Sequence, residues 1–404
     1  NRTVTLTGMI FDLGTLDTFT LVVGWGDPLS PDNETTHTYG ASDTGNQTFE
    51  LTHQYLDDNP TGTKLDVYTI ATTVTDDDGL ADTDSTAITV TNVAPTVVLD
   101  PVSDILGRSG WPSDEDGSII LTGTITDPGT LDTYTLIIDW GDPLSPNNET
   151  THAFGATTAG GHSFTYTHQY LDDNPAETTV DTYTITATVT DDDTHSSTDS
   201  TTVTISNVAP IITLDSVSDI SEDGTATLTG TFTDPGTLDT YTLVINWGDP
   251  LSPDNETTRN FDATDLGSHS FTYTHQYLDD NPTATDGDIY TISATVTDDD
   301  TLSGSAHTTV NITNVVPILI FDTVAGINED GTATLTGTIS DPGTLDTFTL
   351  AVDWGDPLSP ANVTTHTYEA SATGTRAFTL THHYLDDNPS ATDHAIYTIS
   401  ATVT

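Results

Sequence analysis

The tetrapeptide Trp-Gly-Asp-Pro occurs four times in this chain of 404 residues, and its copies begin at Trp25, Trp140, Trp247 and Trp354. Successive copies are separated by 115, 107 and 107 residues, and an Asp-Asn-Pro tripeptide that begins at Asp58 repeats with the same spacings. Such a period is too long for a solenoid unit and has the length of one small domain. We therefore expect similar domains in tandem, an organisation typical of spacers, stalks and fibres rather than of enzymes.

Three similar linkers mark the expected domain boundaries, since Asn-Val-Ala-Pro begins at Asn92 and Asn207 and Asn-Val-Val-Pro begins at Asn314. The linkers are short and contain no glycine, so neighbouring domains should be held close together. The predicted domains are residues 1–94, 95–209, 210–316 and 317–404.

The two outermost predicted domains differ from the others. The first lacks the segment that follows the linker elsewhere, so we expect its first strand to be missing, and the last stops before its final strand. We interpret the chain as a window from a longer array; the alternative is head-to-tail assembly in which neighbouring chains complete each other's sheets. The second domain carries eight extra residues, Leu106–Ser113, expected to form a surface loop around Trp111.

Apolar residues alternate with threonine along short segments, the period of a strand with one buried face. In residues 183–190, Tyr, Ile, Ala and Val alternate with four threonines, and a similar pattern ends at Trp140. About seven such strands fit into each repeat, and no helical periodicity is present. The sequence therefore predicts an all-β chain of tandem immunoglobulin-like sandwiches, arranged end to end as a rod.

The chain is strongly acidic, with 62 Asp and Glu residues against 5 Lys and Arg residues and a formal charge of −57. Nucleic acids and acidic membrane surfaces are poor partners for such a chain, whereas polyvalent cations are good ones. Cysteine is absent, which excludes disulfides and thiolate metal sites. No apolar stretch has the length of a membrane span, so we expect no membrane insertion in this segment.

The order of the repeated elements is also that of a known family. Trp-Gly-Asp at Trp140 is followed by a His-x-Tyr step at His168, then by the strand and acidic run of residues 183–193, then by the linker at Asn207. In this combination each repeat resembles the PKD (polycystic kidney disease) domain, and the likeness covers essentially the whole chain. Pro143 stands where the family commonly has glycine.

A second departure from the PKD pattern is the segment Leu171–Pro175, which is longer than the turn of the family at that place. The resemblance implies an extracellular β-sandwich used for spacing, adhesion or carbohydrate contact. The two departures leave the local function of these loops open.

Acidic residues cluster in the predicted loops. Sandwich topology brings the loops of one end of a domain together, and a short linker then sets one acidic end against the next. A calcium ion, which takes about 6–8 oxygen ligands, would turn this repulsion into a clamp. The candidate metal ligands are Asp127, Asp132, Asp191, Asp192, Asp193, Glu115, Asp116, Asp142, Asp172, Asp173, Asp234, Asp239, Asp298, Asp299, Asp300, Glu222 and Asp223.

Two alternatives explain the acidic loops without calcium. Asp is a good turn former and keeps a long protein soluble. An acidic surface also suits a protein from an acidic or highly saline habitat.

One Asn-x-Thr triplet recurs in every repeat, in the loop after Trp-Gly-Asp-Pro, and glycosylation is one reading of it. The alternative is that these asparagines are ordinary loop residues. The four positions are Asn33, Asn148, Asn255 and Asn362.

One histidine of each repeat, such as His168, lies on the apolar face of its strand, and we expect a hydrogen-bonded core residue there rather than a catalyst or a zinc ligand. The repeated tryptophans are expected in the core. No nucleophile elbow and no phosphate-binding glycine loop is present, so an enzyme is not expected.

These observations favour a structural repeat segment of a long secreted cell-surface or extracellular filament protein, stiffened by calcium at acidic loops between domains. The partners would be neighbouring repeats or copies of the chain in a fibre. The alternative is an adhesin, or a carbohydrate-binding accessory array of a secreted protein, whose partners would be surface glycans.

Overall fold

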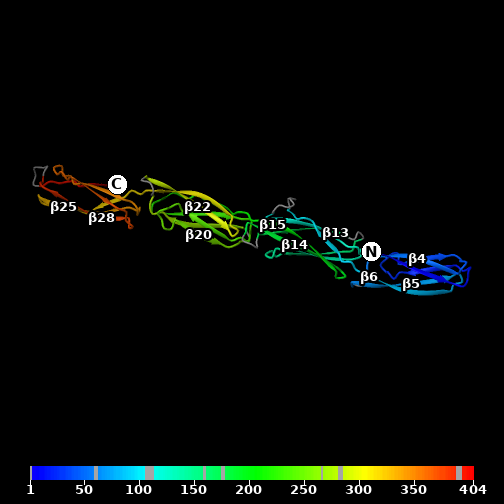
Figure 1. Cartoon of the computed structure of the whole chain (residues 1–404). Coiled ribbons are helices and arrows are strands. Elements are labelled where there is room, and N and C mark those ends of the chain that lie inside the picture. Colours follow the sequence, from blue (N-terminus) through cyan, green and yellow to red (C-terminus); the bar gives the residue numbers. More distant parts are fainter. Residues whose placement is uncertain are drawn as a thin grey trace. The chain divides into compact units, whose positions relative to one another are not determined.

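A computed structural model describes residues 2–58, 62–104, 113–157, 161–173, 178–264, 267–280, 285–387 and 394–404, and every regular element in these ranges is a β-strand (Figure 1). The chain forms two compact units, Asn1–Asn207 and Val208–Thr404. We call residues 1–94, 95–209, 210–316 and 317–404 repeats 1 to 4. The described residues contain no helix long and apolar enough to cross a membrane.

Repeat 1 has two antiparallel sheets. In the first, β1 (Arg2–Phe11) pairs along its whole length with β4 (Asn46–Tyr55). The second sheet has the order β3-β2-β5-β6, with the bounds Glu34–Tyr39, Phe19–Gly24, Leu65–Asp76 and Ala81–Thr91.

Repeat 2 adds strands to both sheets. The first sheet has the order β13-β10-β7, with the short β8 also on β10, and the bounds are Gly161–Gln169, Ser118–Thr126, Thr96–Leu99 and Ser103–Asp104. The second sheet has the order β12-β11-β14-β15-β9, with the bounds Glu149–Phe154, Tyr134–Asp139, Val180–Asp191, Ser196–Ser206 and Ser113–Asp114. β9 runs parallel to β15, and all the other pairs are antiparallel.

The second unit repeats this plan. Repeat 3 has the orders β16-β18-β21 and β17-β23-β22-β19-β20, with the bounds Ile211–Leu214, Thr225–Thr233, Ser268–Gln276, Ile220–Ser221, Ser303–Thr313, Gly287–Asp298, Tyr241–Asn246 and Glu256–Phe261. Repeat 4 has the orders β24-β25-β28 and β27-β26-β29, with the bounds Ile318–Phe321, Gly331–Ser340, Thr375–Tyr384, Val363–Tyr368, Phe348–Asp353 and Ser400–Val403.

The two sheets of each repeat enclose one hydrophobic core, and each core draws its residues from a single repeat. The alternation predicted for residues 183–190 is confirmed, because Tyr183, Ile185, Ala187 and Val189 are all buried. Threonine occupies many of the outward positions, where a β-branched polar side chain suits a solvated sheet face.

The described residues of repeat 2 form nine strands instead of the expected number of about seven, because two-residue strands flank its inserted segment. Most of that insertion, including Trp111, lies outside the described residues. Its last residue is not in a surface loop as expected, since Ser113 begins β9 and is buried.

The Trp-Gly-Asp-Pro turn is built into the core of every repeat. In repeat 2, Trp140 is fully buried and stacks on His168, whose Nε2 lies 3.0 Å from Oδ2 of the buried Asp142. The hydroxyl of Tyr170 donates to the carbonyl of Trp140 at 2.8 Å. The core positions predicted for the histidine and the tryptophan are therefore confirmed.

We expect His168→Ala to lower the unfolding free energy of repeat 2 by about 3 kcal/mol, because it removes a stacked ring and leaves a buried carboxylate without its donor. Native-state hydrogen exchange of β11 and β13 in the whole chain measures this loss. The other three repeats keep their own histidines and serve as internal controls. Unchanged exchange in repeat 2 would contradict the role assigned to the histidine.

Candidate metal sites

Three buried carboxylates from two successive repeats meet in the first unit. Asp57 and Asp58 follow β4 in repeat 1, and Asp193 lies in the turn between β14 and β15 in repeat 2. At least one oxygen of each lies within 4.8 Å of the others. Asp58 and Asp193 are each only 2% exposed. We call this group, together with the adjacent Asp132, the first cluster.

Backbone and core contacts fix the turns that carry these carboxylates. The hydroxyl of Tyr68 in β5 donates to the carbonyl of Asp57 at 3.2 Å, which ties the turn to the core. Thr194 takes a left-handed conformation with φ 70°, and its amide donates to the carbonyl of Asp191. This tight turn directs Asp193 inward.

The segment between β10 and β11 adds further carboxylates beside Asp57. Asp127 accepts a hydrogen bond from the amide of Gly129 at 2.7 Å, and Asp132 is 1% exposed. A Cβ on Gly129 would lie 2.3 Å from Oδ2 of Asp132, so only glycine lets this carboxylate approach so closely. The amide of Thr130 donates to the carbonyl of Leu56, which joins the two repeats at this point.

Several buried carboxylate oxygens of the first cluster and of the neighbouring Asp127 have no hydrogen-bond donor among the described residues. They are both carboxylate oxygens of Asp132 and of Asp193, Oδ2 of Asp58 and Oδ2 of Asp127. A buried carboxylate oxygen without a donor is costly, and a bound cation would remove that cost.

The electrostatics of the first cluster oppose full ionisation. Burial, followed by the adjacent Asp57, raises the pKa of Asp132 to about 9. Burial and the charge of Asp193 raise the pKa of Asp58 to about 7, and burial and Asp192 raise the pKa of Asp193 to about 6. Such increases in pKa are expected where like charges are gathered in a site from which water is excluded.

The second unit holds an equivalent group, here called the second cluster. Glu222 and Asp279–Asp280 of repeat 3 and Asp346 of repeat 4 have oxygens within 4.8 Å of one another. The amide of Val315 donates to Oε1 of Glu222 at 2.7 Å, whereas Oε2 has no donor among the described residues. A Cβ on Gly343 would lie 2.5 Å from that Oε2, so a glycine again gives the carboxylates room.

The second cluster shows the same electrostatics as the first. Burial raises the pKa of Glu222 to about 8. Burial and the charge of Asp279 raise the pKa of Asp346 and of Asp280 to about 6.

A third group lies inside repeat 2, where oxygens of Glu115, Asp172 and Asp173 are within 4.8 Å of one another. Asp172 and Asp173 occupy the same place in their repeat as Asp57 and Asp58. The hydroxyl of Tyr183 donates to the carbonyl of Asp172 at 3.1 Å, as Tyr68 does to Asp57.

Other predicted ligands have structural partners in place of a cluster. Asp142 is held by His168, and Asp116 has a left-handed φ of 58° with its Oδ1 accepting from Gln169. Asp191 accepts from His195 and Asn92, and Asp192 accepts from Thr133.

In repeat 3, Asp223, Asp298 and Asp299 likewise have structural partners. Asp223 accepts from Gln276, Asp298 from Leu302 and Asp299 from Thr240. Asp234 follows β18 and accepts from the amide of Gly236, Asp239 lies between β18 and β19, and Asp300 lies in the turn after β22.

Sequence reasoning missed five cluster residues of repeats 1, 3 and 4, which are Asp57, Asp58, Asp279, Asp280 and Asp346. The signal for them was present, because they occupy the repeat positions of predicted ligands Asp172, Asp173 and Asp239.

The asparagines of the recurring Asn-x-Thr triplet stabilise the Trp-Gly-Asp-Pro loop. In all four copies the side-chain oxygen accepts from the amide of the turn aspartate at 2.6 Å, as Asn148 does from Asp142. The Nδ2 atom of Asn148 also donates to Asp139 at 3.1 Å. These contacts give the asparagines a structural role, and their glycosylation stays a prediction.

The two clusters that join repeats offer a ligand set that fits calcium. Every ligand in them is a carboxylate oxygen, no imidazole is part of them, and the chain has no cysteine. Hard oxygen ligands in irregular loops suit calcium, whereas zinc and copper prefer nitrogen and sulfur.

No protein-family model and no curated protein matches the chain. Among solved structures it is similar to a tetra-tandem repeat in the extending region of a large adhesion protein, with 17% identity, a TM-score of 0.44 and coverage of 99% of this chain and 94% of that one.

Two other solved structures are similar over about 30% of their own length. Dimeric latent PorU from Porphyromonas gingivalis matches 71% of this chain with 13% identity and a TM-score of 0.19. Trypsin-activated alpha-2-macroglobulin from Escherichia coli matches 96% of it with 10% identity and a TM-score of 0.18. At TM-scores this low, none of the three assigns a fold family or a function.

Proposed function

We propose that this chain is a structural repeat segment of a long secreted cell-surface or filament protein, in which calcium clamps successive immunoglobulin-like, PKD-like domains together. The domains would be residues 1–94, 95–209, 210–316 and 317–404. The role would be that of a spacer without catalysis, and its partners would be adjoining repeats or further copies of the chain.

The strand order supports the immunoglobulin-like assignment. In repeat 2 the first sheet carries β7, β10 and β13, and the second carries β11, β12, β14 and β15 with β9 parallel to β15. The buried Trp140 follows β11, and the hydroxyl of Tyr183 in β14 bonds to the backbone eleven residues upstream, as in a tyrosine corner.

The calcium proposal rests on one observation, which is that the carboxylates of the first cluster come from two successive repeats. Asp57 and Asp58 come from one repeat and Asp193 and Asp132 from the next, so an ion bound to all of them bridges two repeats. The buried oxygens of Asp193 and Asp132 lack donors within the described residues, and burial together with like charge raises the pKa of both groups. A divalent cation satisfies the oxygens and neutralises the charge at once.

Calcium titration of the whole chain by calorimetry tests this proposal. We expect saturable binding to at least two sites, one for each cluster that joins repeats, and a thermal transition that moves to higher temperature with calcium because only the folded clusters bind it. Magnesium is the matched control, since it keeps its bound waters and should bind more weakly. Absence of binding at about millimolar calcium would refute the clamp and leave turn formation and solubility as the reasons for the acidic loops.

A further inference from the structure

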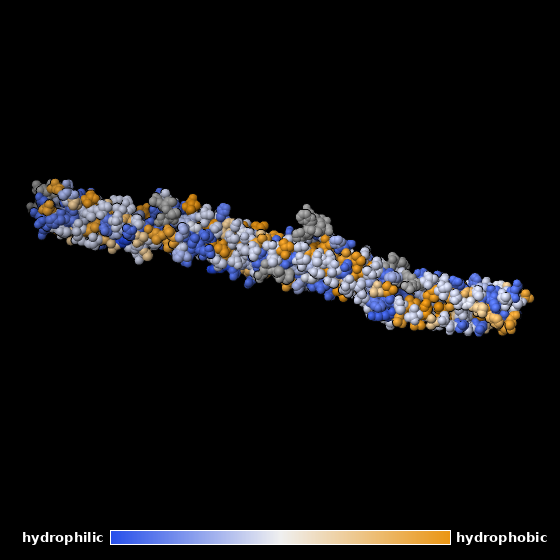
Figure 2. All heavy atoms as spheres, viewed as in Figure 1, coloured by the Kyte–Doolittle hydropathy of each residue, from blue (hydrophilic) through white to orange (hydrophobic). Residues whose placement is uncertain are grey.

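Asp127 of repeat 2 and Asp341 of repeat 4 are buried carboxylates outside the set that the proposed clamp uses. Figure 2 shows hydrophilic residues along the visible surface of the chain, where water solvates them, whereas Asp127 and Asp341 are each only 6% exposed. In both residues Oδ1 accepts from the amide two positions later, at 2.7 Å from Gly129 and 2.9 Å from Gly343. Oδ2 of each is buried and has no donor among the described residues. One oxygen therefore shapes the turn, and the other is left for a ligand.

Both carboxylates lie beside the clusters that join repeats. The side chain of Asp127 interacts directly with that of Asp132, which in turn interacts directly with Asp57 of the preceding repeat. In the second unit the side chains of Asp341 and Asp346 interact in the same way. An oxygen of Asp346 lies within 4.8 Å of oxygens from the other carboxylates of the second cluster. Asp127 and Asp341 are therefore the next carboxylates in line beyond each cluster.

One calcium ion does not reach all of these carboxylates. A ligand oxygen lies about 2.3–2.6 Å from the ion, so two oxygens on the same ion are at most about 5 Å apart. At the two junctions, the groups whose oxygens all lie within 4.8 Å of one another are Asp57, Asp58 and Asp193, and Glu222, Asp279, Asp280 and Asp346. Among the described residues, neither group includes Asp127 or Asp341. An ion bound to either group therefore leaves their Oδ2 atoms without a partner.

The negative charge at each junction also exceeds what one ion neutralises. With Asp127 the first cluster has five carboxylates, and with Asp341 the second cluster also has five. Five ionised carboxylates carry a charge of −5, so one divalent ion leaves −3 and two leave −1. Burial, followed by the charges of Asp191 and Asp57, raises the pKa of Asp127, which reflects this excess of negative charge. A second cation at each junction would remove most of the excess.

We propose that each of these two junctions binds a second calcium ion next to the one that forms the clamp. The second ion lies between Asp127 and Asp132 in the first unit, and between Asp341 and Asp346 in the second. A carboxylate has two oxygens, so Asp132 and Asp346 each give one oxygen to either ion and bridge the pair. In such two-metal sites the ions are about 3.5–4 Å apart. The inference rests on the proposed calcium clamp and adds a linked second ion to it.

Equilibrium dialysis of the whole chain with radioactive calcium counts the bound ions and tests this proposal. The D127N variant removes a ligand of the second ion, and D193N removes a ligand of the first. Asn at position 127 keeps the oxygen that accepts from Gly129, so the turn is retained. At a calcium concentration that just saturates the parent, each variant should bind about one ion fewer and D127N/D193N about two fewer. Weak binding to surface carboxylates is common to all the variants and cancels from these differences.

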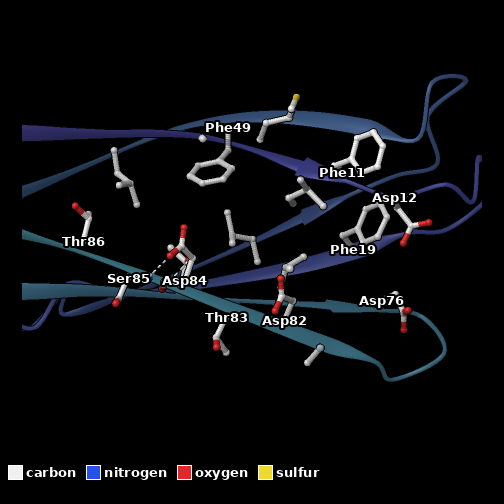
Figure 3. Close-up of a pocket in the computed structure, with 18 of the residues that line it drawn as sticks. Phe11, Asp12, Phe19, Phe49, Asp76, Asp82, Thr83, Asp84, Ser85 and Thr86 are labelled. Atoms are coloured by element: carbon white, nitrogen blue, oxygen red, sulfur yellow. Dashed lines mark hydrogen bonds between the residues drawn. The ribbon is translucent and has the colours of Figure 1, made fainter.

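The D12N variant is the matched control. Asp12 occupies the place of Asp127 in repeat 1, and its Oδ1 makes the same turn contact with the amide of Gly14, at 2.6 Å. Figure 3 shows Asp12 next to Phe11 at the end of its strand. Asp12 is only half-buried and, among the described residues, belongs to none of the groups of three or more carboxylates. D12N should therefore bind as many calcium ions as the parent.

The possible outcomes separate this inference from the clamp itself. D341N repeats the test in the second unit and keeps it valid if D127N folds poorly. An unchanged ion count in D127N and D341N would overturn the second ion and leave the clamp intact. A loss of only about one ion in D127N/D193N would show that both residues bind the same ion, and would also overturn the proposal. If the parent bound no calcium, the clamp and the second ion would both be refuted.

Discussion

Asp193→Asn is expected to weaken calcium binding at the first cluster about 100-fold, which corresponds to about 3 kcal/mol. The substitution keeps the shape of the side chain and removes a buried charge that two repeats would share with one ion in the proposed clamp. In the presence of a chelator the effect on stability is the opposite. The variant should melt at a higher temperature than the parent, because residue 193 is no longer charged and is not repelled by Asp57 and Asp58. Calorimetric titration and thermal melts of the whole chain measure both effects.

The matched control is Asp78→Asn. Asp78 occupies the same place in repeat 1 as Asp193 in repeat 2, in the same type of turn, but it is exposed and belongs to neither cluster. It should change neither the calcium affinity nor the melt in chelator. If the two variants behaved alike, the acidic turns would act through overall charge and not through a defined site.

The pH dependence of stability should change sign with calcium. In chelator, the pKa values of Asp132, Asp58 and Asp193 are raised from 3.8 to about 9, 7 and 6. The folded state therefore binds more protons than the unfolded state between those limits, and stability falls as pH rises through this window. With calcium bound the carboxylates must be ionised, so calcium affinity rises with pH over the same window, by about tenfold per unit for each displaced proton.

Two measurements check this reversal. Thermal melts in chelator should show a falling midpoint between about pH 5 and pH 9, and melts in saturating calcium should not. Titration at about pH 7 in two buffers of different ionisation enthalpy should reveal release of about one proton or more per ion at the first cluster. The D132N variant should release fewer protons, and an unchanged number would remove Asp132 from the site.

The fold could be predicted from the sequence to the extent that it depends on local pattern. Alternation of apolar residues with threonine identified the strands, and the repeat itself identified the four cores. The short strands β8 and β9 were missed because two residues carry no periodicity. Their pairing depends on neighbours that are distant in sequence, as when Ser113 pairs with Ile205.

The site was predicted in part. Acidic loops could be recognised, but the residue that each carboxylate faces could not. Asp142 was assigned to calcium because it lies in a turn, whereas its partner is His168, 26 residues later on another strand. Asp191 accepts hydrogen bonds from the side chain of Asn92 and the amide of His195, whereas the oxygens of Asp193 have no donor within the described residues. This difference depends on the left-handed conformation of Thr194, which no sequence pattern indicates.

The division of the first and second carboxylate clusters between two successive repeats has an evolutionary consequence. An Asp-Asp turn held by a tyrosine and an acidic segment before the third strand recur in the repeats, so a duplicated copy brings both halves with it. Unequal recombination within the gene would then lengthen or shorten the array by whole repeats, and a copied pair of repeats would carry both halves of its carboxylate cluster. Array length can thus vary between related genes while each copied pair of repeats keeps its own carboxylates.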